Sequence, residues 1–161
     1  MSLLDGILKK KTVEIFSPIV GECVSIKEVP NPTFSQEILG KGVAIKPLEG
    51  KVYAPVDGKI STLFPTLHAV GITTEDGVDI LIHVGLDTVS LKGAAFQAFV
   101  KAGDSVKKGE LLLEADLQAI TEAGLDTITP ILICNSKECK EVSMVKSGKV
   151  TTEDYILQIK K

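Results

Sequence analysis

The sequence lacks the features of a secreted or membrane-spanning protein. Its 161 residues include only three widely spaced cysteines, which predict free thiols in a reducing compartment rather than a disulfide framework: Cys23, Cys134 and Cys139. No apolar run approaches the ~18–20 residues that span a bilayer. The N-terminal segment also lacks the apolar core and small-residue cleavage site of a signal peptide. We therefore expect a cytoplasmic protein.

The sequence also lacks an excess of positive charge. Its formal net charge is −3 and its pI is about 5.4, and no basic stripe occurs beyond Lys9, Lys10 and Lys11. Proteins that bind the phosphate backbone of nucleic acids usually carry a basic field, so we expect no nucleic-acid partner. The apolar fraction of 44% and the charged fraction of 24% are those of an ordinary globular protein.

Residues 12–161 contain no linker or low-complexity segment and are predicted to form one domain. Residues 1–11 are predicted to form a flexible tail. The alternative is a short basic amphipathic helix that touches an anionic membrane, because three lysines follow the helically spaced Leu3, Leu4, Ile7 and Leu8. Isolated helices this short are marginally stable, which favours the tail.

Almost all of the periodic pattern is of the β type. Short alternations of apolar and polar residues recur between turn signals, which predicts an all-β fold, an antiparallel sandwich or barrel. The expected strands cover residues 13–16, 21–25, 43–47, 51–53, 58–62, 69–73, 79–84, 111–115, 131–134 and 155–159. The expected helices are few and short: residues 116–123, with Asp116 as N-cap, and one or two turns within residues 93–99.

The chain has two histidines, and strand geometry predicts that they lie together. If Asp76 and Gly77 form a two-residue hairpin loop, Val70 pairs with His83 and His68 becomes a diagonal neighbour at ~7–8 Å. The opposite face of this hairpin is wholly apolar and is expected to belong to the core. A slip of one residue would place the two histidines on opposite faces.

Two such imidazoles suit phosphoryl transfer. Neutral imidazole is nucleophilic near pH 7, and only one ring nitrogen attacks, so the other must be held as N–H by an acceptor. A carbonyl near Gly85 could accept from His83, and His68 could donate a hydrogen bond to phosphoryl oxygens. Thr66 precedes His68 by two residues and could fix its tautomer.

The segment GVDILIHVGLDTV, residues 77–89, resembles the phosphorylation-site signature of the glucose-type enzyme IIA domains of the bacterial phosphoenolpyruvate:sugar phosphotransferase system. Residues 42–47, 54–58 and 66–69 are also similar to that family, and the likeness covers residues 15 to 160. The resemblance implies a β-sandwich built from a duplicated hybrid motif, with the active site in a shallow depression.

The resemblance also implies unequal site roles. His83 matches the phosphoacceptor, modified at Nε2, and His68 matches a second histidine that supports transfer. Thr66 matches the hydroxyl residue bonded to that histidine. Gly85 matches the position whose carbonyl orients the acceptor ring. Asp87 matches an acidic residue at the rim of the site.

The partners implied by the resemblance are proteins. The donor is the phosphohistidine carrier HPr, and the acceptor is a cysteine of a sugar-specific IIB domain or IICB permease; regulatory targets are a further expectation. An apolar docking surface is expected around the histidines. Its candidates, which could equally be core residues, are Phe34, Leu39, Phe64, Val70, Ile72 and Leu81. An acidic rim of Glu37, Asp79 and Asp87 would meet a basic partner.

The main alternative is a zinc metallohydrolase on a related β fold. Catalytic zinc needs three protein ligands and an open position. His68 and His83 supply two, and Asp79 or Asp87 would have to be the third. No cofactor is required for phosphoryl transfer, although the histidine pair could bind zinc adventitiously or with a carboxylate from a partner. The Met1 start favours a free protein over a piece of a larger permease.

Overall fold

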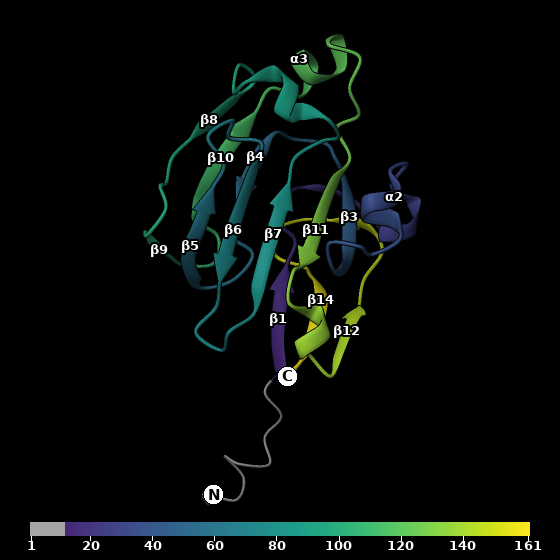
Figure 1. Cartoon of the computed structure of the whole chain (residues 1–161), viewed down its shortest axis with the longest axis vertical. Coiled ribbons are helices and arrows are strands. Elements are labelled where there is room, and N and C mark those ends of the chain that lie inside the picture. Colours follow the sequence, from purple (N-terminus) through teal and green to yellow (C-terminus); the bar gives the residue numbers. More distant parts are fainter. Residues whose placement is uncertain (1–11) are drawn as a thin grey trace, which may run out of the picture.

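The computed structural model describes residues 12–161, which form strands and short helical segments (Figure 1). The strands are β1 (Thr12–Phe16), β2 (Gly21–Ser25), β3 (Lys41–Pro47), β4 (Lys51–Tyr53), β5 (Gly58–Leu63), β6 (Ala69–Thr73), β7 (Asp79–His83), β8 (Phe96–Ala98), β9 (Ser105–Val106), β10 (Leu111–Ala115), β11 (Thr129–Ile133), β12 (Glu141–Met144), β13 (Gly148–Val150) and β14 (Tyr155–Lys160). The helical segments are η1 (Ile26–Glu28), α2 (Pro32–Ser35), η2 (Thr88–Leu91), α3 (Leu117–Glu122) and η3 (Ser136–Glu138).

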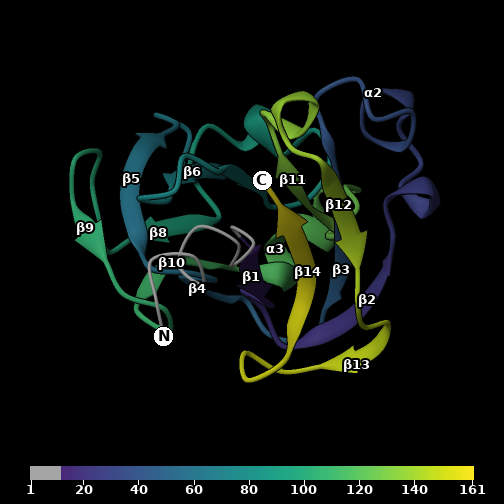
Figure 2. The ribbon, with the colours of Figure 1, turned by 90° about the horizontal axis from the view of Figure 1, so that it is seen from below.

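The described strands form three antiparallel sheets. The large sheet has the order β13-β2-β3-β11-β7-β6-β5-β9, and the small sheets have the orders β1-β14-β12 and β4-β10-β8. Viewed from below, the large sheet curves around the two small ones (Figure 2). The prediction of an all-β antiparallel sandwich with a few short helices is confirmed.

Two apolar clusters cover opposite faces of the large sheet. The larger one joins alternate residues of the large sheet, such as Ile80 and Ile82, to the small sheets. The second cluster contains Phe34, Ala44 and Leu132, and Leu81 packs against it. Strand β11 is buried along its whole length, because it has core on both faces. The second cluster brings α2 onto the face that carries the outward residues of β7.

Most of the expected strands lie within two residues of the observed ones. The predicted helix at residues 116–123 is confirmed as α3, with the Asp116 carboxylate accepting from the Ala119 N–H at 3.0 Å. The helical turns expected within residues 93–99 are wrong, because Phe96–Ala98 pairs with β10 as a strand. The predicted tail lies outside the described residues. Within residues 12–161, no helix is long and apolar enough to cross a membrane.

The register expected for the β6–β7 hairpin is wrong by one residue. Ala69 pairs with His83 and Thr73 with Asp79. Gly77 has a φ of +87° and its N–H bonds the Thr74 carbonyl at 3.0 Å, so the loop has three residues instead of two. An Asp-Gly pair fits both loop types, since in each it supplies the left-handed position.

The shifted register changes which side chains face outward. Val70 and Ile72 now share a face with Ile80 and Ile82 and are fully buried in the core. Their predicted place on a docking surface is therefore wrong. Leu81 and His83 lie on the opposite face, which the second cluster partly covers.

Candidate functional site: a histidine pair at one end of two strands

His83 is the last residue of β7 and is partly buried. Its Nδ1 lies 2.8 Å from the carbonyl oxygen of Gly85. A carbonyl only accepts hydrogen bonds, so Nδ1 of His83 carries the proton. In the neutral ring, Nε2 then keeps the free lone pair, and this is the nitrogen available for attack.

The backbone conformation and the close packing at position 85 require a glycine. Its φ is +77°, and a Cβ there would lie 2.6 Å from Cγ2 of Thr88 and 2.9 Å from the Asp126 carbonyl oxygen. The buried Thr88 hydroxyl donates to the Val84 carbonyl at 2.5 Å, and the Leu86 N–H donates to the Asp126 carbonyl at 2.9 Å. These bonds fix the carbonyl that orients the His83 ring.

His68 directly precedes β6 and is buried, with a fractional exposure of 4%. Its Nδ1 lies 2.6 Å from Oγ1 of Thr66. The rings of His68 and His83 have centroids 4.9 Å apart and planes at 82°. The structure thus brings together the four residues that the sequence predicted: Thr66, His68, His83 and Gly85.

The regular alternation of side chains along the hairpin does not explain the contact between the His68 and His83 rings. The His68 carbonyl accepts from the Val84 N–H at 2.7 Å, so His68 lies opposite Val84. Val84 is a core residue on the face of Ile82, and regular alternation would direct His68 there too. The prediction that the rings meet is correct, although the register from which it was made is wrong.

Two phenylalanines pack against the histidine rings. Phe34 of α2 lies 5.0 Å from His83 between ring centroids, and Phe64 lies 5.3 Å from His68 in an edge-on arrangement. Phe34 is buried and Phe64 is partly buried. The sequence did not decide whether Phe34 and Phe64 belong to the core or to a docking surface. In the structure, each packs against one of the two imidazole rings.

The remaining rim residues are exposed to different degrees. Leu39 is 43% exposed, Asp87 is exposed and Leu81 is partly buried. Ile38, which sequence reasoning missed, is 65% exposed and directly precedes Leu39. Asp79 lies at the opposite end of β7 from His83 and accepts from the Thr73 hydroxyl at 2.8 Å, so it is not a rim residue.

Strained backbone accompanies the site. Four residues other than glycine have a positive φ among residues 12–161, and all belong to segments bordering the histidine pair: Glu37, Leu67, Asp87 and Lys92. Glu37 follows α2, Leu67 precedes His68, and Asp87 and Lys92 flank η2. Side chains other than glycine visit this region at an energetic cost, and such residues cluster at functional sites.

Burial keeps both imidazoles neutral. Burial, and to a smaller extent the nearby His83, lowers the pKa of His68 from 6.5 to about 4. Burial also lowers the pKa of His83, while the Gly85 carbonyl and the charge of Asp87 act in the opposite direction. Neutral rings are what a nitrogen nucleophile and a neutral hydrogen-bond donor require.

No third metal ligand joins the histidines among the described residues. Within residues 12–161, no group of three or more His, Cys, Asp or Glu side chains is arranged to hold a metal ion. The residues of the site therefore do not fit the three-ligand catalytic zinc centre of a metallohydrolase.

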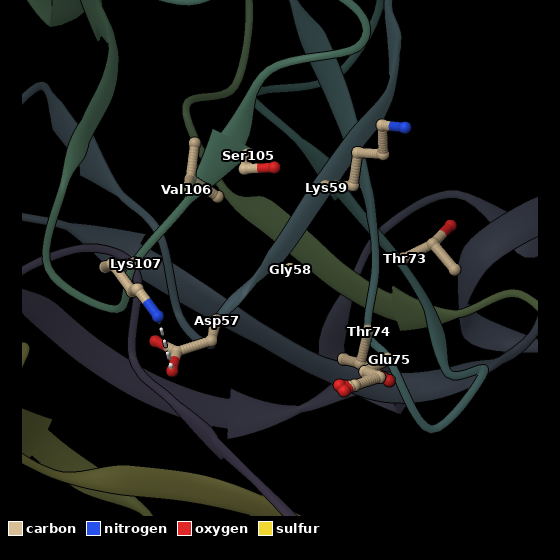
Figure 3. Close-up of a pocket in the computed structure, with 9 residues that line it drawn as sticks. All are labelled: Asp57, Gly58, Lys59, Thr73, Thr74, Glu75, Ser105, Val106 and Lys107. Carbon is tan, nitrogen blue, oxygen red and sulfur yellow. Dashed lines mark ion pairs between the residues drawn. The ribbon is translucent and has the colours of Figure 1, made fainter.

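A separate cavity of about 550 Å³ lies at the other end of β6 (Figure 3). Its walls include Thr73, Glu75 and the ion pair of Lys107 with Asp57, whose charged atoms are 3.9 Å apart. Both of these charged side chains are largely exposed, at 86% and 65%. Solvated pairs of this kind contribute little energy, so the histidine pair is the stronger candidate site.

Comparisons with known proteins find relatives over most of this chain. The family model "phosphoenolpyruvate-dependent sugar phosphotransferase system, EIIA 1" matches residues 13–139. A glucose-specific EIIA component of Oceanobacillus iheyensis is 45% identical over 150 residues, which are 92% of this chain and 91% of that protein. A beta-glucoside-specific EIIBCA component of Dickeya chrysanthemi is 46% identical over 90% of this chain, which spans only 23% of that protein's length.

A solved structure has the same fold. The glucose permease IIA from Mycoplasma capricolum superposes with a TM-score of 0.87 and 36% sequence identity. The match covers 94% of this chain and 97% of that one. At this identity and coverage, the likeness extends to the whole described β-sandwich.

Proposed function

The chain belongs to the EIIA 1 family of the phosphoenolpyruvate-dependent sugar phosphotransferase system, and from this premise we propose that His83 is its phosphoryl acceptor. The bond from Nδ1 of His83 to the Gly85 carbonyl is the observation that carries the proposal. It leaves Nε2 as the nucleophile, as a protein phosphocarrier requires. The chain is thus a phosphotransferase component of sugar uptake.

The transfer itself is an exchange of one P–N bond for another. The Nε2 lone pair of His83 attacks the phosphorus of a donor phosphohistidine, a new P–N bond forms, and the donor P–N bond breaks with its electrons returning to the donor ring. Nδ1 of His83 keeps its proton throughout and donates it in the hydrogen bond to the Gly85 carbonyl. In the onward step, a thiolate attacks the same phosphorus and His83 regains its lone pair.

His68 has a supporting role in this proposal. At neutral pH its ring is uncharged, because its pKa is about 4. If Thr66 donates its hydroxyl proton to Nδ1 of His68, Nε2 of His68 carries the hydrogen and can donate to a phosphoryl oxygen. A donor aimed at charge that develops in the transition state is worth about 10²–10³-fold in rate.

The proposed partners are the carrier HPr as donor and a IIB or IICB protein as acceptor, in the cytoplasm. Relatives named EIIBCA and EIICBA join an EIIA domain to such components in one chain. Two exposed apolar side chains, Ile38 and Leu39, follow the α2 segment whose Phe34 packs on His83, and we propose them as a surface for a transient protein contact. No cofactor enters these steps.

Incubation with phosphoenolpyruvate, enzyme I and HPr tests the proposal. We expect stoichiometric labelling of the wild type, none of His83→Gln, and labelling without efficient onward transfer for His68→Gln. An unlabelled wild type, or equal labelling of His83→Gln, would overturn the assignment. Zinc titration of the two variants, followed by calorimetry, separately tests metal binding by the histidine pair.

A further inference from the structure

The turn that joins β5 to β6 carries the second histidine on an unusual backbone. The Leu67 N–H donates to the Phe64 carbonyl at 2.7 Å, and the Phe64 N–H donates to the Ala69 carbonyl at 3.1 Å. Leu67 has a φ of 60°, in the left-handed region where a leucine is an outlier. His68 follows it and is the last residue before the strand.

The turn at the other end of β6 is built in the same way but is one residue shorter. There the Gly77 N–H donates to the Thr74 carbonyl and the Thr74 N–H donates to the Val78 carbonyl, both at 3.0 Å. Gly77 is left-handed, and the next residue is already paired. In the β5–β6 turn, His68 is inserted between the left-handed Leu67 and the paired Ala69.

The inserted residue leaves the alternation of the strand. Ala69 pairs with His83, so it lies on the histidine face of the hairpin. His68 should then point into the core, yet its ring packs on His83 and on Phe64 and bonds Thr66. Two successive residues therefore serve one face, which is the local effect of a bulge.

We propose that Leu67 is a positioning residue for phosphoryl transfer: its left-handed backbone turns His68 out of the pleat and onto the ring of His83. The proposal rests on the proposed function of the pair. It predicts that the backbone conformation at this position, and not the leucine side chain, sets the orientation of His68. Residues that accept a positive φ should then replace Leu67, and residues that resist it should not.

Three variants separate backbone from side chain. Glycine and asparagine adopt the left-handed region most readily, and β-branched valine resists it. Leu67→Gly and Leu67→Asn should keep the wild-type rate of onward transfer. Leu67→Val should still accept phosphoryl groups but pass them on about 10²-fold more slowly, as expected for loss of one aligned donor.

The matched control is Gly77→Val, which places the same β-branched side chain on the left-handed residue of the opposite turn. A Cβ at Gly77 would meet only Nζ of Lys161, at 3.5 Å. This control should lower the unfolding midpoint while onward transfer by the folded protein stays at the wild-type rate. A transfer defect in Gly77→Val equal to that of Leu67→Val would overturn the proposal, because strain alone would then explain both.

An NMR titration of His68 supplies a readout that needs no phosphoryl transfer. We expect the pKa of His68 to stay near 4 in the wild type, Leu67→Gly and Leu67→Asn, and to move toward 6.5 in Leu67→Val. A wild-type transfer rate or an unshifted His68 pKa in Leu67→Val would overturn the proposal. Should that variant not fold, a His68 pKa near 6.5 in Leu67→Gly would do so instead.

A failure of the proposed function gives a different result. In that case the wild type takes no label from HPr. The His68 pKa values of the variants still show whether the backbone at Leu67 orients the His68 ring.

Discussion

The two ends of the β6–β7 hairpin differ: one is a short turn, and the other carries the histidine pair. The turn that joins β6 to β7 lies at the lower end of these strands in Figure 1. Gly77 is its left-handed residue, and the neighbouring cavity is lined by solvated charges. At the other end, Leu67 and Asp87 are left-handed without being glycine, and the buried His68 and the partly buried His83 each pack against a phenylalanine.

The difference shows where this fold accepts an unfavourable backbone conformation. Gly77 takes the left-handed conformation without steric cost in a plain turn, and Gly85 does the same at the histidine end. Residues with side chains hold the same conformation where a histidine must be aimed, and the surrounding hydrogen bonds over-determine it.

The largest contrast should come from two of the left-handed glycines, Gly85 and Gly77. Gly85→Ala would force a Cβ against Thr88 and Asp126, so we expect a loss of about 3 kcal/mol in unfolding free energy, from backbone strain plus overpacking. Gly77→Ala has room and should lose about 1 kcal/mol. Urea denaturation measures both, and equal losses would contradict the close packing around Gly85.

The next contrast concerns pH. The pKa of His68 is lower in the folded protein than in the unfolded chain. Below pH 6.5 the unfolded chain therefore binds more protons, and the free energy of unfolding decreases as the pH is lowered. Between pH 6.5 and 5, His68 should account for about 2 kcal/mol of lost stability. The loss through this histidine should continue until pH falls to about 4.

Denaturant titrations at several pH values check this slope. The His68→Gln variant should have a shallower slope than the wild type by that amount. The remaining slope should include His83, whose pKa burial also lowers. A variant with an unchanged slope would show that His68 is not held neutral by the fold.

Two threonines at opposite ends of β6 give a smaller contrast. Thr66→Val removes the partner of Nδ1 of His68, and Thr73→Val removes the hydroxyl that donates to Asp79. Each should cost about 1 kcal/mol of stability. Only Thr66→Val should slow onward phosphoryl transfer, by about tenfold, because the tautomer of His68 is then no longer fixed. A similar slowing in Thr73→Val would remove the distinction between the two ends.

The smallest effect on stability is expected for the exposed apolar rim. Ile38→Ala and Leu39→Ala should change the unfolding free energy by no more than about 0.5 kcal/mol, since both side chains are largely solvated. They should raise the Kd for HPr several-fold, as measured by calorimetry. Leu48→Ala is the control and should leave that Kd unchanged, because Leu48 is 68% exposed and lines a separate hollow with Gly50 and Phe96.

The strands were predictable because burial imposes a two-residue period on the sequence. The pattern around Ile80 and Ile82 identified β7, and the Asp116 cap identified α3. Residues 96–98 were mistaken for part of a helical turn, because a three-residue strand is too short to show a period and exists only by pairing with β10. The exposed Ile38 gave no periodic signal either.

The register of the hairpin was the weak link in predicting the site. Asp76 and Gly77 fit a loop of two residues and a loop of three, and the choice moves Val70 and Ile72 from one face to the other. With the three-residue loop, the side chains of Val70 and Ile72 are fully buried. A two-residue loop would have placed them on the opposite face of the hairpin. The energy that selects the register is therefore burial across the sandwich, which no local pattern reports.

The sequence by itself determined that the chain is an antiparallel β-protein and singled out His83 and His68 as its candidate site, because alternation and a specific motif are local properties of residues. Only the tertiary structure decided how the two rings meet. That depends on the left-handed turn at Leu67, on the Gly85 carbonyl that accepts from Nδ1 of His83, and on Phe34 of α2, which packs on the His83 ring. The bond from the Leu86 N–H to Asp126 and the contact of Phe34 with His83 join segments distant in the chain, and their geometry follows from packing rather than from periodicity.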